Sequence, residues 1–255
     1  MPATSLTLLC LPCAGASATM YLRWRRLLPR WIEIAPVELP GRGSRLGERF
    51  VEDFDTLVAR LCDEQAEAMR GASAFAFFGH SMGALLAHGM TRHLHERGER
   101  LPLALIASGS AAPSRRDTAR LRAALGDDAS LAADLRRQGG TPEEVFANAE
   151  LLRLTLDVLG ADYRVCDSFR HVPRPPLPVP LHVFAGRQDE IAPERLAAWS
   201  LESDTAVTLD WFDGGHFFVR QQESAVLTAL TRHLSALGVP AHPVQPLHPA
   251  PGAFA

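Results

Sequence analysis

The stretch from Phe75 to Leu86 constrains the fold of this chain more than any other. Its first four residues are apolar and predict a short buried strand, and the residues from Ala84 onward predict a helix. Between them lies Gly79-His80-Ser81-Met82-Gly83, which fits G-x-S-x-G, the pattern of a serine nucleophile on a sharp strand-to-helix turn. Glycines two residues on either side leave room for such a turn, and the helix N-terminus favours negative charge that develops beside the serine. A strand, turn and helix in this order predict an α/β fold.

The rest of the chain continues this alternation. Strand-like runs cover residues 6–11, 32–39, 101–108, 181–185 and 207–212. Helical or amphipathic spacing of apolar residues covers 21–28, 51–69, 84 to about 95, 193–199 and 224–237. Alternating strands and helices favour a mostly parallel central sheet with helices on both faces.

Residues 112–174 break this rhythm, because they contain no strand-like run and are rich in Ala, Leu, Arg and Glu. Thr141-Pro142-Glu143-Glu144 predicts a helix start, with a threonine cap, proline at the first position and acids in the first turn. We expect an all-helical insertion of three or four helices over the loop-bearing edge of the sheet, where it acts as a lid. The alternative is a helical cap without a gating role. The predicted core is 1–111 and 175–237, and 238–255 is expected to be a flexible tail.

Asp189 and His216 complete a candidate catalytic set with Ser81. Each follows a predicted strand directly, so in a parallel sheet all three lie at the same edge. The chain order Ser, Asp, His is that of the α/β-hydrolase fold. In this interpretation Ser81 is the nucleophile, His216 the base and Asp189 the group that orients the imidazole. An oxyanion needs two backbone donors, and we expect the N–H groups of Met82 and Ala14 to supply them. Taken alone, the aspartate or the histidine would be interpreted as a loop residue.

Composition excludes several other classes. A net charge of −3 without a basic block gives no indication of nucleic-acid binding. No apolar stretch approaches the length that spans a bilayer, and residues 1–6 lack the basic region of a signal peptide, so a cytoplasmic location is expected and no membrane partner.

Cysteine and histidine patterns predict no metal and no cofactor. Four cysteines fit reduced thiols, and the C-x-x-C spacing of Cys10 and Cys13 lacks the second pair that a zinc or redox site would require. His88, His93 and His95 are expected on a solvated helix face.

The motifs together resemble those of stand-alone type II thioesterases of nonribosomal peptide and polyketide synthesis, members of the α/β-hydrolase superfamily. The matching segments extend from about residue 6 to 236 and are Leu11-Pro12-Cys13-Ala14-Gly15-Ala16, Glu38-Leu39-Pro40-Gly41-Arg42-Gly43, Gly79-His80-Ser81-Met82-Gly83, Gly139-Gly140-Thr141-Pro142, Ala161-Asp162-Tyr163 to Pro178, and Gly214-Gly215-His216-Phe217-Phe218.

This resemblance implies hydrolysis of acyl or aminoacyl thioesters on the 4′-phosphopantetheine arm of carrier domains, through an acyl-enzyme on Ser81. It also implies Ala14 and Met82 as oxyanion donors and the insertion as a lid over the acyl and pantetheine channel. Carrier domains would be the partners of a monomeric enzyme that frees stalled or wrongly loaded synthases. The chain departs from the family at Cys13, where histidine, tyrosine or phenylalanine is usual, at Ala16, where glycine is usual, and at Gln188-Asp189-Glu190, where Asp-Asp-Pro is common.

Other functions use the same residues. A carboxylesterase or lipase and a medium-chain acyl-carrier-protein thioesterase would share the catalytic set, because esters and thioesters pass through similar tetrahedral intermediates. A product-releasing terminal thioesterase shares the fold, although it normally follows a carrier domain and none is expected before residue 6. A binding protein without activity is a further alternative, against which the intact set argues.

Overall fold

A six-stranded parallel sheet organises the fold. The structure is a computed structural model that describes residues 5–238 of the 255-residue chain. The strands are β1 (Leu6–Leu11), β2 (Ile32–Pro36), β3 (Ala74–His80), β4 (Leu105–Ser108), β5 (Leu181–Gly186) and β6 (Val207–Phe212). Their order across the sheet is β2-β1-β3-β4-β5-β6, and every neighbouring pair is parallel. The predicted fold class is therefore confirmed.

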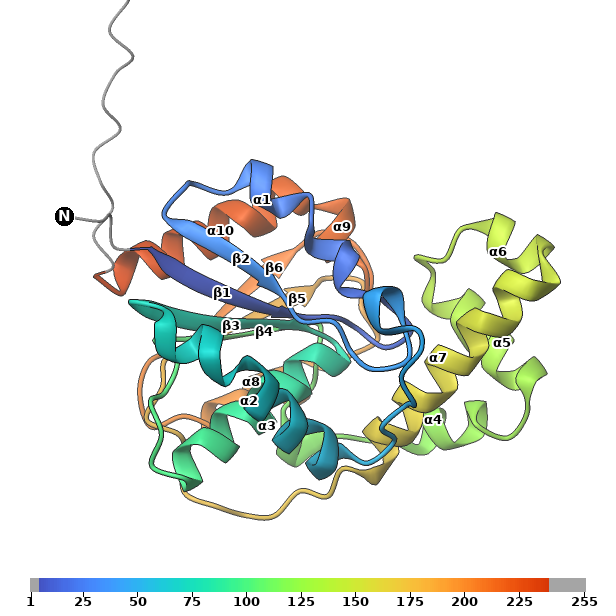
Figure 1. The fold of residues 1–255 in the computed structure, drawn as a ribbon, viewed down its shortest axis with the longest axis horizontal. Helices are drawn as coiled ribbons and strands as arrows, with labels where there is room; N and C mark the ends of the chain where they lie inside the picture. The colour runs from blue at the N-terminus through green and yellow to red at the C-terminus, as the bar shows by residue number, and fades with distance from the viewer. Residues whose placement is uncertain (1–4, 239–255) are drawn as a thin grey trace, which may run out of the picture.

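Helices cover both faces of this sheet (Figure 1). One face carries α2 (Phe54–Gly71), α3 (Met82–Glu96), α8 (Pro193–Ala197) and the 3-10 turn η4 (Ala198–Leu201). The other face carries η1 (Ala18–Tyr21), α1 (Trp24–Leu27), α9 (Phe218–Gln221) and α10 (Glu223–Ala236). A short η2 (Gly43–Arg45) lies in the loop after β2.

The central strand β3 contributes to both layers of the core. Phe75 and Phe77 belong to the hydrophobic cluster on the α2 and α3 side, whereas Ala76 and Phe78 belong to the cluster on the α1 and α10 side. This division follows from the two-residue period of a strand, and it explains why the run is apolar at every position. Burial of each phenylalanine stabilises the fold by about 1.5–3 kcal/mol. The strand that precedes Ser81 is thus held from both sides.

The region predicted as a helical insertion contains η3 (Pro113–Arg115), α4 (Ala119–Ala124), α5 (Asp128–Gln138), α6 (Glu143–Ala147) and α7 (Ala149–Ser168). These helices lie beyond the carboxyl ends of the strands (Figure 1). The threonine cap predicted at Thr141 is wrong. Pro142 occupies the N-cap position of α6 without a side-chain hydrogen bond, because the helix begins only at Glu143, one residue too late for the threonine to reach its free N–H groups.

Several predicted boundaries also differ from the structure. The helix predicted from residue 51 begins at Phe54, because the Asp53 side chain accepts a hydrogen bond from the Thr56 N–H at 2.9 Å and caps it there. The strand predicted over 32–39 ends at Pro36, and that over 101–108 begins at Leu105. Of the predicted tail, residues 239–255 lie outside the described residues.

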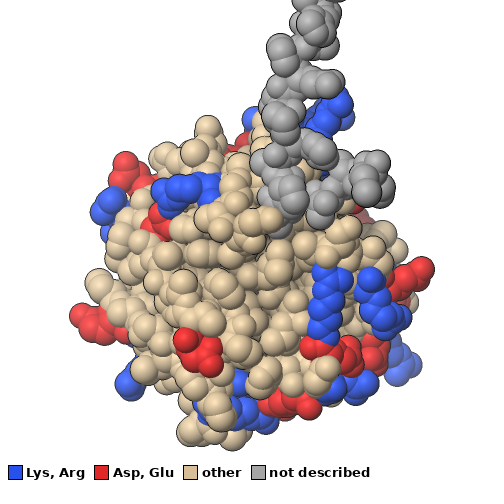
Figure 2. Space-filling view, turned by 90° about the vertical axis from the view of Figure 1, so that its left-hand side faces the viewer, with Lys and Arg blue, Asp and Glu red and all other residues tan. Residues whose placement is uncertain are grey.

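Two observations on the described residues concern the apolar length of the helices and the charge on one face of the molecule. No helix in this part of the chain is long and apolar enough to cross a bilayer. Figure 2 shows the face at the amino ends of the strands, where arginines lie next to acidic side chains and no single sign of charge covers the surface. The pattern of charge on this face agrees with the absence of a basic block in the sequence.

Candidate active site

Ser81 occupies a strained turn between β3 and α3. Its φ of 55° and ψ of −113° make it the only non-glycine residue with positive φ in the described part of the chain. The Ser81 N–H donates to the Ser108 carbonyl at 2.7 Å, which ties the turn to β4. Backbone strain of this kind costs about 1–3 kcal/mol and persists where the surrounding fold enforces it.

The two glycines of the motif permit this turn by close packing of backbone on backbone. A Cβ at Gly79 would lie 2.1 Å from the Gly83 carbonyl oxygen, and a Cβ at Gly83 would lie 2.2 Å from the Leu11 carbonyl oxygen. Both contacts are far shorter than carbon and oxygen tolerate. Any larger side chain would separate β1, the turn and α3, so the sequence pattern has a direct steric reason here.

Asp189 and His216 are joined by a hydrogen bond. His216 Nδ1 lies 2.9 Å from Asp189 Oδ2, and the two side chains are only 17% and 7% exposed. Asp189 lies in the loop after β5 and His216 in the loop after β6. These loops approach closely because Gly186 has no side chain: a Cβ there would lie 2.6 Å from the Gly215 carbonyl oxygen. A carboxylate at Nδ1 fixes the imidazole orientation and leaves Nε2 free for proton transfer.

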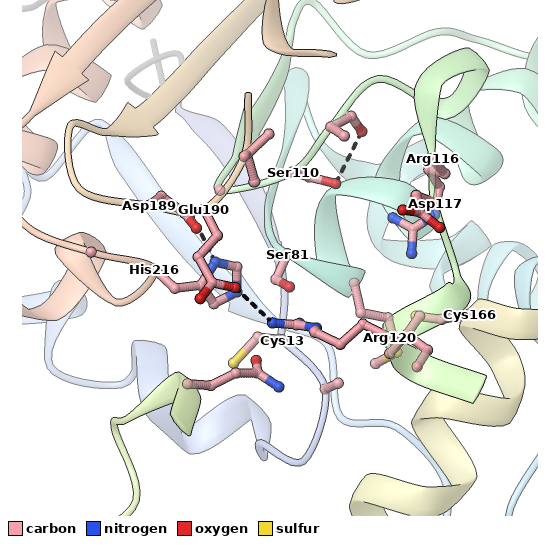
Figure 3. A pocket seen from close by; sticks show the side chains of 18 of the residues that line it. Cys13, Ser81, Ser110, Arg116, Asp117, Arg120, Cys166, Asp189, Glu190 and His216 are labelled. Carbon is pink, nitrogen blue, oxygen red and sulfur yellow. Dashed lines mark hydrogen bonds and ion pairs between the residues drawn. The ribbon is translucent and has the colours of Figure 1, made fainter. Parts of the chain in front are cut away.

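One cavity of about 430 Å³ brings the five predicted site residues together. Its lining includes Ser81, Met82, Ala14, Asp189 and His216. Figure 3 shows Ser81 beside the His216 ring, which is joined to Asp189. No hydrogen bond joins Ser81 to His216 among the described residues, and bonds of this kind commonly tighten only when substrate binds. Met82 begins α3, so its N–H has no acceptor within the helix.

His80 lies directly behind this group. Its ring centroid is 5.2 Å from that of His216, its Nδ1 is 3.0 Å from the Ser108 hydroxyl, and the side chain is fully buried. Burial lowers the pKa of His80 well below its usual value, and His216 lowers it further. A neutral His80 places no second positive charge behind the His216 ring.

A buried ion pair supports the loop that carries Ala14. Arg42 donates to both carboxylate oxygens of Asp162 in α7, at 2.5 and 2.6 Å, and these side chains are 6% and 2% exposed. Asp162 also accepts the Gly15 N–H at 2.8 Å, and Arg42 donates to the Ala16 carbonyl at 3.3 Å. Sequence analysis missed this link, although both charged residues lie in segments that carry the family resemblance.

Charged side chains of the insertion also line the cavity, and the sequence reasoning did not find them. Arg120 of α4 forms an ion pair at 3.4 Å with Glu190, the residue after Asp189 (Figure 3). Arg116 and Asp117, which precede α4, lie on the same wall. No pattern in the sequence singles out these residues within the insertion.

The cysteines offer no reactive thiolate. All four are buried free thiols, and burial raises the pKa of Cys13 to about 11 and of Cys166 to about 11. Cys13 lines the cavity, where it presents a neutral thiol. No group of His, Cys, Asp and Glu that could hold a metal ion occurs in residues 5–238.

The expectation of three solvated histidines on α3 is wrong for His88. This side chain is buried at 6% exposure, 3.3 Å from a Glu202 carboxylate oxygen and 5.8 Å from the Trp199 ring. Helix α3 packs against α2, and Trp199 of η4 packs against His88, so solvent does not reach this side chain. His95 is exposed and His93 is partly exposed.

Comparisons with known proteins agree with this geometry. The profile of the Thioesterase domain family matches residues 6–237. Thioesterase PikA5 of Streptomyces venezuelae is 34% identical over 234 residues, which cover 91% of this chain and 82% of that protein. The solved structure of the type II thioesterase BorB from the borrelidin biosynthetic cluster is 38% identical, with a TM-score of 0.80 and coverage of 92% and 95%. ClbQ from the colibactin pathway is 28% identical, with a TM-score of 0.85 and coverage of 92% and 99%.

Proposed function

The chain belongs to the thioesterase domain family, and from that premise we propose that it hydrolyses acyl or aminoacyl thioesters on the 4′-phosphopantetheine arm of carrier domains. It would serve nonribosomal peptide or polyketide synthases, since ClbQ is described as part of the colibactin NRPS/PKS pathway and BorB as a type II thioesterase of a biosynthetic cluster. The observation that carries this proposal is a strained serine in one cavity with a histidine that a buried aspartate orients.

In the first step, Ser81 Oγ attacks the thioester carbonyl while His216 Nε2 takes the hydroxyl proton. Asp189 holds the Nδ1 proton and stabilises the imidazolium that forms. The tetrahedral intermediate collapses when the carbon–sulfur bond breaks, and His216 returns the proton to the departing pantetheine thiolate. The acyl group is then an ester of Ser81.

In the second step, water attacks this ester, and His216 takes a proton from the water and gives it to Ser81 Oγ. The free acid leaves and the serine is restored. The negative oxygen formed in both steps would accept hydrogen bonds from the N–H groups of Met82 and Ala14. One such donor stabilises the transition state by about 3–4 kcal/mol in a comparable site. These steps use side chains, backbone and water alone, so the proposal includes no cofactor and no metal.

The helical insertion 112–174 would act as the lid over the acyl and pantetheine channel, with carrier domains as the partners. Its position beyond the carboxyl ends of the strands supports this role (Figure 1). We further propose that the protein acts as a monomer in the cytoplasm, since Ser81, Asp189 and His216 already meet in one cavity of a single subunit and all four thiols are free.

Ser81→Ala provides the test of the proposal. It should abolish release of acyl groups from a carrier domain, by about 10³-fold or more, while the melting temperature stays within a few degrees. Turnover of carrier-bound acyl groups by the unchanged protein is compared with that of p-nitrophenyl esters. A variant that retains most turnover would exclude Ser81 as nucleophile, and a strong preference for p-nitrophenyl esters would assign the site to an esterase instead.

A further inference from the structure

The residue after His216 lies between the candidate base and the helical insertion. Phe217 occupies the N-cap position of α9, and its ring centroid is 5.3 Å from that of His216, with the two planes at 80°. A Cβ on Gly140, in the loop between α5 and α6, would lie 2.8 Å from Cδ2 of the same ring. Phe217 therefore packs against the base on one side and against a loop of the insertion on another.

Gly140 makes this contact because it has no side chain. Its φ of 83° is a conformation that residues with a Cβ rarely adopt, and its backbone packs directly on the ring. Arg220 of α9 supports the contact from both sides. It donates to the Gly140 carbonyl at 3.0 Å, and its guanidinium lies 5.4 Å from the centroid of the Phe217 ring.

The following residue, Phe218, is held in a different way. It is fully buried and stacks on Phe212 of β6, with ring centroids 5.3 Å apart and planes at 5°. It anchors the start of α9 in the core, whereas Phe217 is only partly buried and lines the cavity. Packing of the core therefore explains Phe218 and leaves the other aromatic residue of this motif without a reason.

His80 lies on a further side of the same group. Its ring centroid is 5.9 Å from that of Phe217 and 5.2 Å from that of His216. The His216 ring thus has Asp189 at Nδ1, the buried His80 behind it and Phe217 against it. Phe217 is the neighbour that the insertion holds through Gly140.

We propose that Phe217 is a positioning residue for His216, and that the insertion sets its place through Gly140. While the loop lies on the ring, Phe217 keeps the imidazole in the orientation that presents Nε2 to Ser81. When the loop leaves, the imidazole gains freedom and proton transfer from the serine slows. This inference rests on the proposed thioesterase function. A misplacement of about 1 Å in a site of this kind can lower the rate by about 10²-fold.

Two glycines of the loop form a matched pair for the test. Gly139 ends α5 with a φ of 73°, and a Cβ there meets no atom within 4 Å. Alanine strains the backbone at either position, but only at Gly140 does it also press on Phe217. We expect Gly140→Ala to lower kcat on an acyl carrier domain by about 10- to 100-fold with little change in KM, and Gly139→Ala to change kcat by less than about 3-fold. Equal losses of kcat would overturn the proposal, because backbone strain alone would then explain them.

A double-variant cycle tests whether the effect passes through Phe217. Phe217→Leu should itself lower kcat, and in that background Gly140→Ala should add little, because the ring on which it acts is gone. Losses that multiply independently would contradict the proposal. If the glycine variants do not fold, the exposed Arg220→Gln removes the hydrogen bond to the Gly140 carbonyl and leaves the backbone unchanged. It should lower kcat by about 3- to 10-fold with Phe217 present and not with Phe217→Leu, and an unchanged kcat in the single variant would overturn the proposal.

The rate at which a fluorophosphonate labels Ser81 separates this proposal from the proposed function. The reagent needs the serine and its base but no carrier domain, so labelling should slow in Gly140→Ala and Phe217→Leu as kcat does. Unchanged labelling rates in both variants would show that the base is not displaced and would overturn the proposal. If the unchanged protein is labelled but leaves carrier thioesters intact, the proposed function fails, and the labelling rates of the variants still decide the role of Phe217.

Discussion

Replacement of Asp162 by asparagine should destabilise the protein far more than a single surface charge would. The substitution keeps the shape of the side chain but leaves the Arg42 guanidinium buried at 6% exposure without its carboxylate. Removal of one partner from a buried pair of this kind costs about 3–5 kcal/mol, because the remaining charge stays out of water. That is a large fraction of the roughly 5–15 kcal/mol that holds an ordinary domain folded.

The same helix supplies a matched control. Asp157 lies five residues earlier on α7 and pairs with Arg153 on the surface, where these side chains are 41% and 53% exposed. Asp157→Asn makes the identical chemical change in a solvated pair, whose contribution solvent and salt reduce. Urea unfolding of the two variants at pH 7 compares the free energies of unfolding, and similar losses in both would refute the claim that burial of the Arg42 pair decides its value.

A double variant separates stability from activity. Arg42→Met with Asp162→Leu replaces both charges by apolar groups, so no buried charge remains and most of the lost stability should return. The Gly15 N–H would still lack its acceptor at 2.8 Å, and the loop that carries Ala14 would lose its anchor. We therefore expect kcat of the double variant to stay about 10²-fold below that of the unchanged protein, which is the effect of losing one oxyanion donor. Full recovery of kcat in this variant would show that the network does not position the loop.

Two further predictions concern the loop glycine and a buried histidine. Gly186→Ala should lower kcat/KM by roughly 10- to 100-fold in a thioester hydrolysis assay, because a Cβ 2.6 Å from the Gly215 carbonyl oxygen separates the loops of Asp189 and His216. Gly47→Ala is the control, because a Cβ there meets no atom within 4 Å. Equal kcat/KM in the two variants would contradict the argument. Burial lowers the pKa of His182 to about 4, so between pH 6.5 and 4 the unfolded chain binds the proton that the folded chain refuses, and stability falls as the pH is lowered through this window. His182→Asn should flatten that fall in urea midpoints measured at pH 4.5 and 7, and an unaltered slope would show that His182 is not its source.

Local patterns were sufficient to predict the sheet and the five candidate site residues. Ser81 has its own signature because the turn restricts residues two positions away, and Asp189 and His216 stand immediately after strands. The constraint on the serine acts over a few residues, whereas the aspartate and the histidine were assigned by combining their places after strands with the chain order Ser, Asp, His. The roles of these residues in catalysis remain predictions that the variants above would test.

Contacts between distant segments were not predictable in the same way. Arg42 and Asp162 are 120 positions apart, and with 26 basic residues, all arginine, no pattern says which one meets which acid. His88 was misjudged for a related reason. Periodicity predicts one buried face for α3, but every residue from Met82 to His88 is buried. Glu202, which follows the insertion in the sequence, lies 3.3 Å from His88 and belongs to the contacts that bury it.

These distant contacts bear on what the helical insertion does. Asp162 of α7 holds the loop after β1, and Arg120 of α4 holds the residue next to Asp189, so the insertion contacts the loops on both sides of Ser81. A helical cap that merely covered the sheet would need neither contact. Breaking the buried pair at Asp162 costs far more free energy than breaking the exposed pair at Arg120. Motion of the insertion should therefore occur at α4 while α7 stays in place. Opening at that side would expose the cavity wall without loss of the anchor on Gly15, and under the proposed function it would admit an acyl group while the loop of Ala14 stays in position.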